Sequence, residues 1–155
     1  MAEIIEIKTA ELYVGHNDQV IRTGSVGSCV VIALFDTEKR VGGLAHAMLP
    51  HRKNNLTGDK YPARYVDEAI NNLLEGLKAV GANKKNILAK LVGGASMFKK
   101  LTEEKNSIGS QNIQMARQKL QELGIPIDGE DTGGSSGKMV IFDLKTGIVD
   151  VSTAL

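Results

Sequence analysis

Hydrophobic and polar positions alternate along this chain with two periods, one typical of strands and the other typical of helices. Short apolar runs that end at polar residues or glycines predict strands. These runs lie at residues 4–7, 20–23, 29–35, 41–49, 87–92, 125–128, 139–144 and 148–152. The run at 29–35 is apolar at every position, which is typical of a strand covered on both faces.

Two further segments show the helical period. In the first, apolar residues recur at three- and four-residue intervals from Val66 to Val80; Pro62 suits the first turn and Gly81 ends the helix. The second covers residues 110–123 and stops at Gly124. Its inner apolar stripe consists of Ile113, Ala116, Leu120 and Leu123.

The order of these elements is strands, helix, strand, helix, strands. Strict alternation of strand and helix is missing, so the pattern predicts an α+β fold with layered mixed or antiparallel sheets flanked by helices. A length of 155 residues suits a single domain that covers residues 1–155. The polar segment 51–62 predicts a long exposed loop, and loops of that length are usually functional or mobile.

Composition excludes several classes of function. Net charge is +1 and the chain has three Tyr, three Phe and no Trp, so neither a basic field nor base-stacking platforms favour a nucleic-acid binder. The longest apolar run has seven residues, whereas a membrane-inserted helix needs about 20. The N-terminus has no signal-peptide core. With a lone cysteine, these features predict a cytoplasmic protein.

That cysteine, Cys29, follows a Gly-rich turn and begins the buried strand, and His46 lies in the next strand. A two-residue loop at Thr37 and Glu38 would make Cys29 and His46 direct cross-strand partners, with Cβ atoms about 4.5–5.5 Å apart. A three-residue loop would put them on opposite faces, and a four-residue loop would return His46 to the same face, diagonal to Cys29.

If the two side chains meet, they supply nucleophilic acyl chemistry. His46 takes the thiol proton, a thiolate–imidazolium pair lowers the thiol pKa, and the thiolate attacks a carbonyl carbon. Glycines before Cys29 let backbone N–H groups approach an oxyanion, and Thr23 is a candidate to orient the imidazole. The residues alone leave open the alternative of a buried structural cysteine and a histidine without a catalytic role.

Several blocks in order along the chain carry a family resemblance. They are TGSVGSC at 23–29, GLAHAMLP at 43–50, GGASMF at 93–98, IG with a following Asn at 108–112, and EDTGG at 130–134. With them the chain resembles the CheD family of chemoreceptor glutamine deamidases. One departure is SSGK at 135–138, where Asn-Arg and a further basic residue are expected; it bears on contacts of that loop with substrate or partner.

The resemblance implies a cysteine hydrolase that converts glutamines on chemoreceptor cytoplasmic helices to glutamate through a thioester, releasing ammonia. By analogy, Cys29 is the nucleophile, His46 the general acid/base and Thr23 the residue that orients it. Glutamyl methyl esters are a further implied substrate. The implied fold is similar to that of cytotoxic necrotizing factor toxins, and no metal or organic cofactor is implied.

The resemblance also suggests contacts and partners. Gly27, Ser28, Gly94 and Ser96 are candidate substrate-binding residues in tight turns; a locally bonded turn hydroxyl is the alternative for Ser96. The implied partner is a CheC-type phosphatase of the response regulator, which competes with receptor for the same surface. The protein is then a monomer or a heterodimer with that phosphatase. The alternative function is a non-catalytic regulator that binds receptors or the phosphatase.

Overall fold

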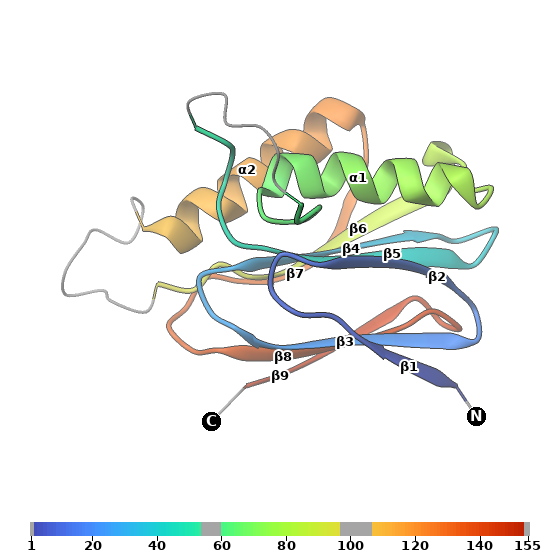
Figure 1. Ribbon diagram of the computed structural model, residues 1–155, viewed down its shortest axis with the longest axis horizontal. Coiled ribbons are helices and arrows are strands. Elements are labelled where there is room, and N and C mark those ends of the chain that lie inside the picture. The colour runs from blue at the N-terminus through green and yellow to red at the C-terminus, as the bar shows by residue number, and fades with distance from the viewer. Residues whose placement is uncertain (1, 54–59, 97–106, 154–155) are drawn as a thin grey trace.

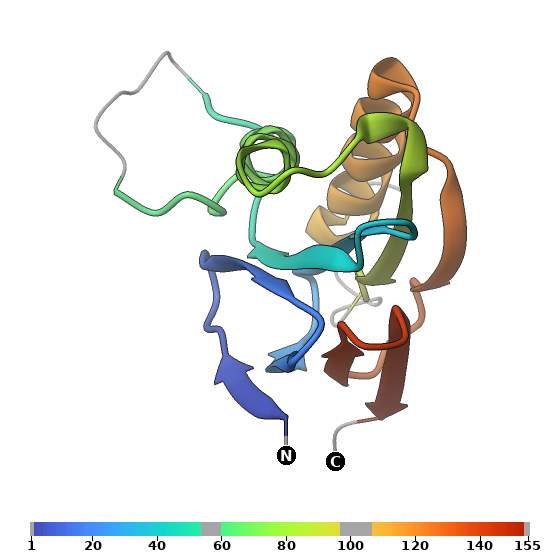
Figure 2. The same cartoon turned by 90° about the vertical axis from the view of Figure 1, so that its right-hand side faces the viewer.

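The computed structural model describes residues 2–53, 60–96 and 107–153. Two β-sheets pack face to face, and two helices cover the outer face of one of them (Figure 1). The turned view shows the same three layers end-on (Figure 2). Each sheet contains one parallel pair of strands and is otherwise antiparallel. The predicted α+β fold with layered mixed sheets is therefore confirmed.

The elements have the following bounds. The five-stranded sheet has the order β2 (Leu12–His16), β5 (Val41–Ala47), β4 (Val30–Asp36), β6 (Ile87–Gly93) and β7 (Ile127–Thr132). The four-stranded sheet has the order β1 (Glu3–Glu6), β3 (Gln19–Val26), β8 (Lys138–Asp143) and β9 (Ile148–Thr153). The helices are α1 (Val66–Ala79) and α2 (Ile108–Leu123), and a 3-10 turn, η1 (Lys84–Asn86), precedes β6. Neither helix is long and apolar enough to cross a membrane.

Two element predictions were wrong. β2 was not among the predicted strands, although Leu12, Tyr13 and Val14 form a short apolar run before Gly15; pairing with β5 makes it an edge strand. Pro62 does not lie in the first turn of α1, which begins at Val66. The Pro62 carbonyl instead accepts a hydrogen bond from the side chain of Asn72.

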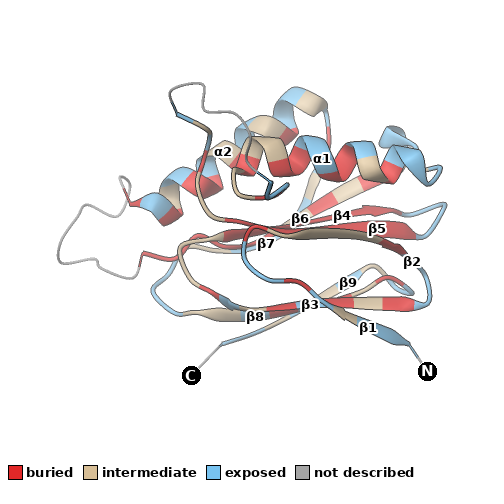
Figure 3. Ribbon diagram, viewed as in Figure 1, coloured by how far each residue is buried: buried red, intermediate tan, exposed pale blue. Residues whose placement is uncertain are grey.

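The central strand β4 separates two apolar layers, and all seven of its residues are buried (Figure 3). Along the strand, residues alternate between the two layers. The side chains that pack toward the helices are Val30, Ile32 and Leu34. Those that pack toward the other sheet are Val31, Ala33 and Phe35. The prediction of a strand covered on both faces is confirmed, because the first layer lies under α1 and α2 and the second lies between the sheets.

The hairpin between β4 and β5 has four loop residues, since Asp36 pairs with Val41. The two-residue alternative is wrong. The Asp36 carboxylate accepts backbone N–H bonds from Glu38 and Lys39 within the loop and from Asn83 outside it. Arg40 takes the left-handed conformation, with φ of 56°. This register places His46 opposite Val31.

Close backbone packing joins the start of α2 to the turn after β6. Gly94 has a φ of +67°, and a Cβ atom at Gly109 would overlap the backbone of Gly94 and the carbonyl oxygen of Ala95. We expect Gly109→Ala to lower the free energy of unfolding by about 2 kcal/mol, as in overpacked cores. Urea denaturation measures this loss.

The matched control is Gly129→Ala in β7, where an added Cβ meets only ordinary contacts with the Lys90 side chain at 3.7 Å. This control is expected to stay within about 0.5 kcal/mol of wild type. Equal stability of the two variants would contradict the close approach of α2 to this turn.

Candidate active site

Thr23 and His46 meet between the two sheets. Thr23 lies on β3 and His46 on β5, and both side chains are buried. The Thr23 Oγ1 atom lies 2.7 Å from His46 Nδ1. The same hydroxyl donates to the carbonyl oxygen of Ile7 at 2.9 Å. A hydroxyl has one proton to donate, so Thr23 accepts from His46, and Nδ1 carries the ring proton.

The remaining ring nitrogen, His46 Nε2, is buried and has no hydrogen-bond partner among the described residues. In the tautomer that Thr23 selects, Nε2 carries a lone pair and no proton. Burial lowers the pKa of His46 to about 4. The imidazole is therefore neutral near pH 7 and has a free basic nitrogen.

The segment between β1 and β2 also fixes the backbone of His46. His46 N–H donates to the carbonyl oxygen of Glu11 at 3.0 Å, and Ala10 N–H donates to the His46 carbonyl at 2.7 Å. Ala10 has a φ of 71°. With the bond from Thr23 to Ile7, one short segment fixes His46 through three hydrogen bonds.

Cys29 lies directly before β4 and packs partly buried against the apolar layer between the sheets. Because His46 pairs with Val31, the register makes Cys29 its diagonal neighbour on the same face, as the four-residue alternative predicted. Burial raises the pKa of the Cys29 thiol, and its own backbone N–H opposes this only in part. The expected lowering of the thiol pKa is wrong for the substrate-free protein, because a neutral His46 supplies no positive charge.

Two turns bring the predicted substrate-binding residues around Cys29. Gly94 N–H donates to the Cys29 carbonyl at 2.7 Å, and Ala95 N–H donates to the Gly27 carbonyl at 2.9 Å. Ser96 N–H donates to the carbonyl of Gly134. The turn after β6 therefore lies against the turn that carries the thiol, and the loop after β7 lies beside the turn after β6.

The Ser96 hydroxyl is buried and has no hydrogen-bond partner among the described residues. The described residues offer no local partner for this hydroxyl, and its part in binding the glutamine side chain stays a prediction. Met97 and Phe98 of the same motif lie outside the described residues, as does the part 54–59 of the predicted loop 51–62.

No role was assigned from the sequence to two contributors to this region, Ile7 and Asn112, although Asn112 stands in one of the motifs that carry the resemblance. Ile7 acts through its carbonyl oxygen, which no residue pattern reveals. Asn112 is fully buried on α2, where its side chain donates to the carbonyl oxygens of Ser28 and Met48. A signal for Asn112 was present, because it is a polar residue four positions before Ala116 on the inner stripe of the helix.

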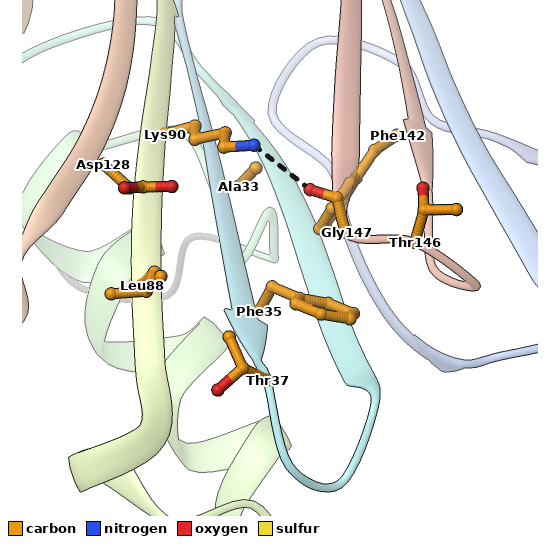
Figure 4. A pocket seen from close by; sticks show the side chains of 9 residues that line it. All are labelled: Ala33, Phe35, Thr37, Leu88, Lys90, Asp128, Phe142, Thr146 and Gly147. Carbon is orange, nitrogen blue, oxygen red and sulfur yellow. Dashed lines mark hydrogen bonds between the residues drawn. The ribbon is translucent and has the colours of Figure 1, made fainter.

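A hollow at the other end of β4 is separate from this site (Figure 4). Phe35 and Phe142 lie in its wall, and Lys90 Nζ donates to the Gly147 carbonyl at 3.3 Å. Its lining contains no cysteine or histidine. The hollow therefore brings together neither a thiol nor an imidazole, whereas Cys29 lies at the opposite end of β4.

Comparisons with known proteins show the family of this chain. A family model described as CheD chemotactic sensory transduction matches residues 48–153. The probable chemoreceptor glutamine deamidase CheD of Methanococcus vannielii is 40% identical over 148 residues, which cover 96% of this chain and 94% of the relative. The chemoreceptor glutamine deamidase CheD of Halalkalibacterium halodurans is 37% identical over 154 residues, which cover 99% of this chain and 95% of the relative. The chain belongs to the CheD family.

A solved structure, that of the Bacillus licheniformis hypothetical protein YfiH, covers 81% of this chain and 51% of that chain. Its TM-score is 0.49 and its sequence identity 16%. A likeness of this size carries no functional information.

The burial of neutral His46 predicts a pH-dependent stability. The pKa is about 4 in the folded chain and about 6.5 in an unfolded one, so protons bind preferentially to the unfolded state as pH falls through this window. Relative to His46→Asn, wild type is expected to lose about 3 kcal/mol of unfolding free energy between pH 6.5 and 4. Urea denaturation across this range measures the loss.

The variant His16→Gln is the control, because His16 is exposed at the end of β2. Its stability is expected to follow wild type with pH. Identical pH slopes for wild type and His46→Asn would contradict a buried neutral imidazole.

Proposed function

We propose that this protein is a chemoreceptor glutamine deamidase in which Cys29 is the nucleophile, His46 transfers protons and Thr23 orients His46. The observation that carries the proposal is the hydrogen bond from His46 Nδ1 to Thr23, which leaves Nε2 as a free base on the face of the sheet that Cys29 shares. The names of the relatives support the substrate, since they act on glutamines of chemoreceptors.

The reaction begins from a neutral thiol and a neutral imidazole. As Cys29 Sγ attacks the amide carbon of a receptor glutamine, the thiol proton passes to His46 Nε2. The Thr23 oxygen accepts the bond from Nδ1–H, so the ring keeps its orientation while it is charged. Backbone N–H groups of the turn at Gly27 and Ser28 are the candidate donors to the oxyanion.

The imidazolium then returns its proton to the amide nitrogen, the C–N bond breaks and ammonia leaves. A thioester between Cys29 and the glutamyl side chain remains. Water attacks this thioester with His46 as base, the C–S bond breaks, and the products are glutamate and the free thiol. A glutamyl methyl ester would pass through the same thioester with methanol as the leaving group.

Further parts of the proposal concern the surroundings of the enzyme. The chain works as a single domain in the cytoplasm, where receptor helices carry the substrate glutamines. A CheC-type phosphatase binds it as a heterodimer and competes with receptor for the surface around Cys29. Gly94 and Ser96 contribute to binding of the glutamine side chain.

The test uses a receptor cytoplasmic fragment and mass spectrometry of the glutamine-to-glutamate change. Cys29→Ala is expected to abolish deamidation, because no nucleophile remains. Thr23→Val keeps the side-chain shape but removes the hydroxyl, and is expected to lower kcat about 10-fold or more.

Thr37→Val is the matched control, since Thr37 is an exposed threonine in the β4–β5 loop, and wild-type kcat is expected. Equal deamidation by wild type and Cys29→Ala would overturn the catalytic role. Receptor signalling that Cys29→Ala still changes, with deamidation abolished, would indicate the non-catalytic regulator in addition.

A further inference from the structure

α2 contributes one buried amide to the space between the Cys29 turn and the segment after β5. Asn112 is fully buried. Its Nδ2 donates to the Ser28 carbonyl at 2.8 Å and to the Met48 carbonyl at 2.9 Å. Ser28 directly precedes the thiol residue, and Met48 lies two positions after His46. One amide nitrogen therefore joins the backbone beside the nucleophile to the backbone beside the base.

The orientation of this amide follows from its partners. Both are carbonyl oxygens, which only accept, so the nitrogen of Asn112 faces them and the oxygen faces away. The oxygen has no hydrogen-bond partner among the described residues. A buried acceptor without a partner costs about 1–3 kcal/mol. An apolar side chain would avoid that cost, so the position is better suited to donating two hydrogen bonds than to packing.

The two carbonyls need this donor because neither belongs to a regular strand. Ser28 lies in the bend before β4, and Met48 follows the last residue of β5. Gly94 and Ala95 already bond the Cys29 turn to the end of β6. The side chain of Asn112 joins this turn to the chain that carries His46.

We propose that Asn112 is a positioning residue, whose two N–H groups fix the Cys29 turn against the end of β5 and so set the place of the thiol relative to His46. This inference rests on the proposed function of the site. Without the two bonds, the turn keeps its contacts with β6 and the domain keeps its layers, but the distance between nucleophile and base is no longer fixed. A misplacement of about 1 Å is enough to cost about 100-fold in rate.

The test compares Asn112→Asp, which keeps the shape but replaces the donor by an acceptor, with Asn112→Ala, which removes the amide without adding charge. Both are expected to lower kcat on a receptor fragment about 10- to 100-fold while KM changes less than about 3-fold. The matched controls are Asn72→Asp and Asn72→Ala. Asn72 is an exposed amide on α1 that donates to the Pro62 carbonyl, and its variants are expected to match wild type.

A second readout needs no receptor. Because Cys29 is the only cysteine, alkylation by iodoacetamide reports on this thiol alone. In Asn112→Ala the alkylation profile is expected to shift to lower pH, since a released turn exposes the thiol to water. In Asn112→Asp the added carboxylate raises the thiol pKa and opposes this shift. Turnover in Asn112→Ala then falls while the accessibility of the thiol rises. A general loss of stability in a protein that remains folded does not produce this combination.

Circular dichroism and thermal unfolding establish that each variant is folded at the assay temperature. If both variants unfold, Asn112→Ser, which adds neither charge nor volume, carries the same two expectations. Wild-type kcat and a wild-type alkylation profile in folded Asn112→Ala, or in Asn112→Ser where it takes its place, would overturn the role of Asn112. A wild type without deamidase activity would instead overturn the proposed function, and the alkylation profile would still decide whether Asn112 fixes the turn.

Discussion

The hydroxyl proton of Thr23 decides which nitrogen of His46 carries the ring proton. Thr23 donates it to the Ile7 carbonyl, so the hydroxyl oxygen is left to accept from His46 Nδ1. The other ring nitrogen, Nε2, thereby keeps its lone pair and is the base in the proposed mechanism. This bond crosses between the two sheets, from β3 to β5. It forms only when both sheets are packed and the segment between β1 and β2 is in place. Folding of the whole sandwich therefore precedes a competent base.

Burial determines how the pair reacts. It lowers the pKa of His46 and raises that of the Cys29 thiol, so each group is neutral in the resting protein. A cysteine hydrolase with a preformed thiolate has a nucleophile ready for any electrophile. In the mechanism that we propose for this site, the proton moves as the carbonyl carbon is attacked, so reactivity depends on a substrate that reaches the turn at Cys29. A threonine hydroxyl in place of a carboxylate orients the ring but contributes no negative charge to stabilise an imidazolium.

The sequence predicted much of the fold, because β4 is an unbroken apolar run and the helices have strong periodicity. Because side chains alternate between the two faces of a strand, the possible hairpin loop lengths also limited His46 to a few positions relative to Cys29. The actual register depends on Asp36, whose carboxylate binds the backbone of Asn83 far along the chain. No local pattern predicts that contact. The Ile7 carbonyl and the strand β2 were missed for the same reason, since tertiary pairing defines them. Asn112 had a visible signal, a polar residue on an apolar stripe, but its partners are backbone atoms.

The most direct test of this account is the tautomer of His46, read from the ¹⁵N chemical shifts of its imidazole ring. We expect a neutral ring near pH 7 with the proton on Nδ1, and a titration midpoint of about 4. In Thr23→Val the preference for the Nδ1–H tautomer should weaken. A proton on Nε2, or an imidazolium near pH 7, would contradict the claim that Thr23 leaves Nε2 free to act as the base for Cys29.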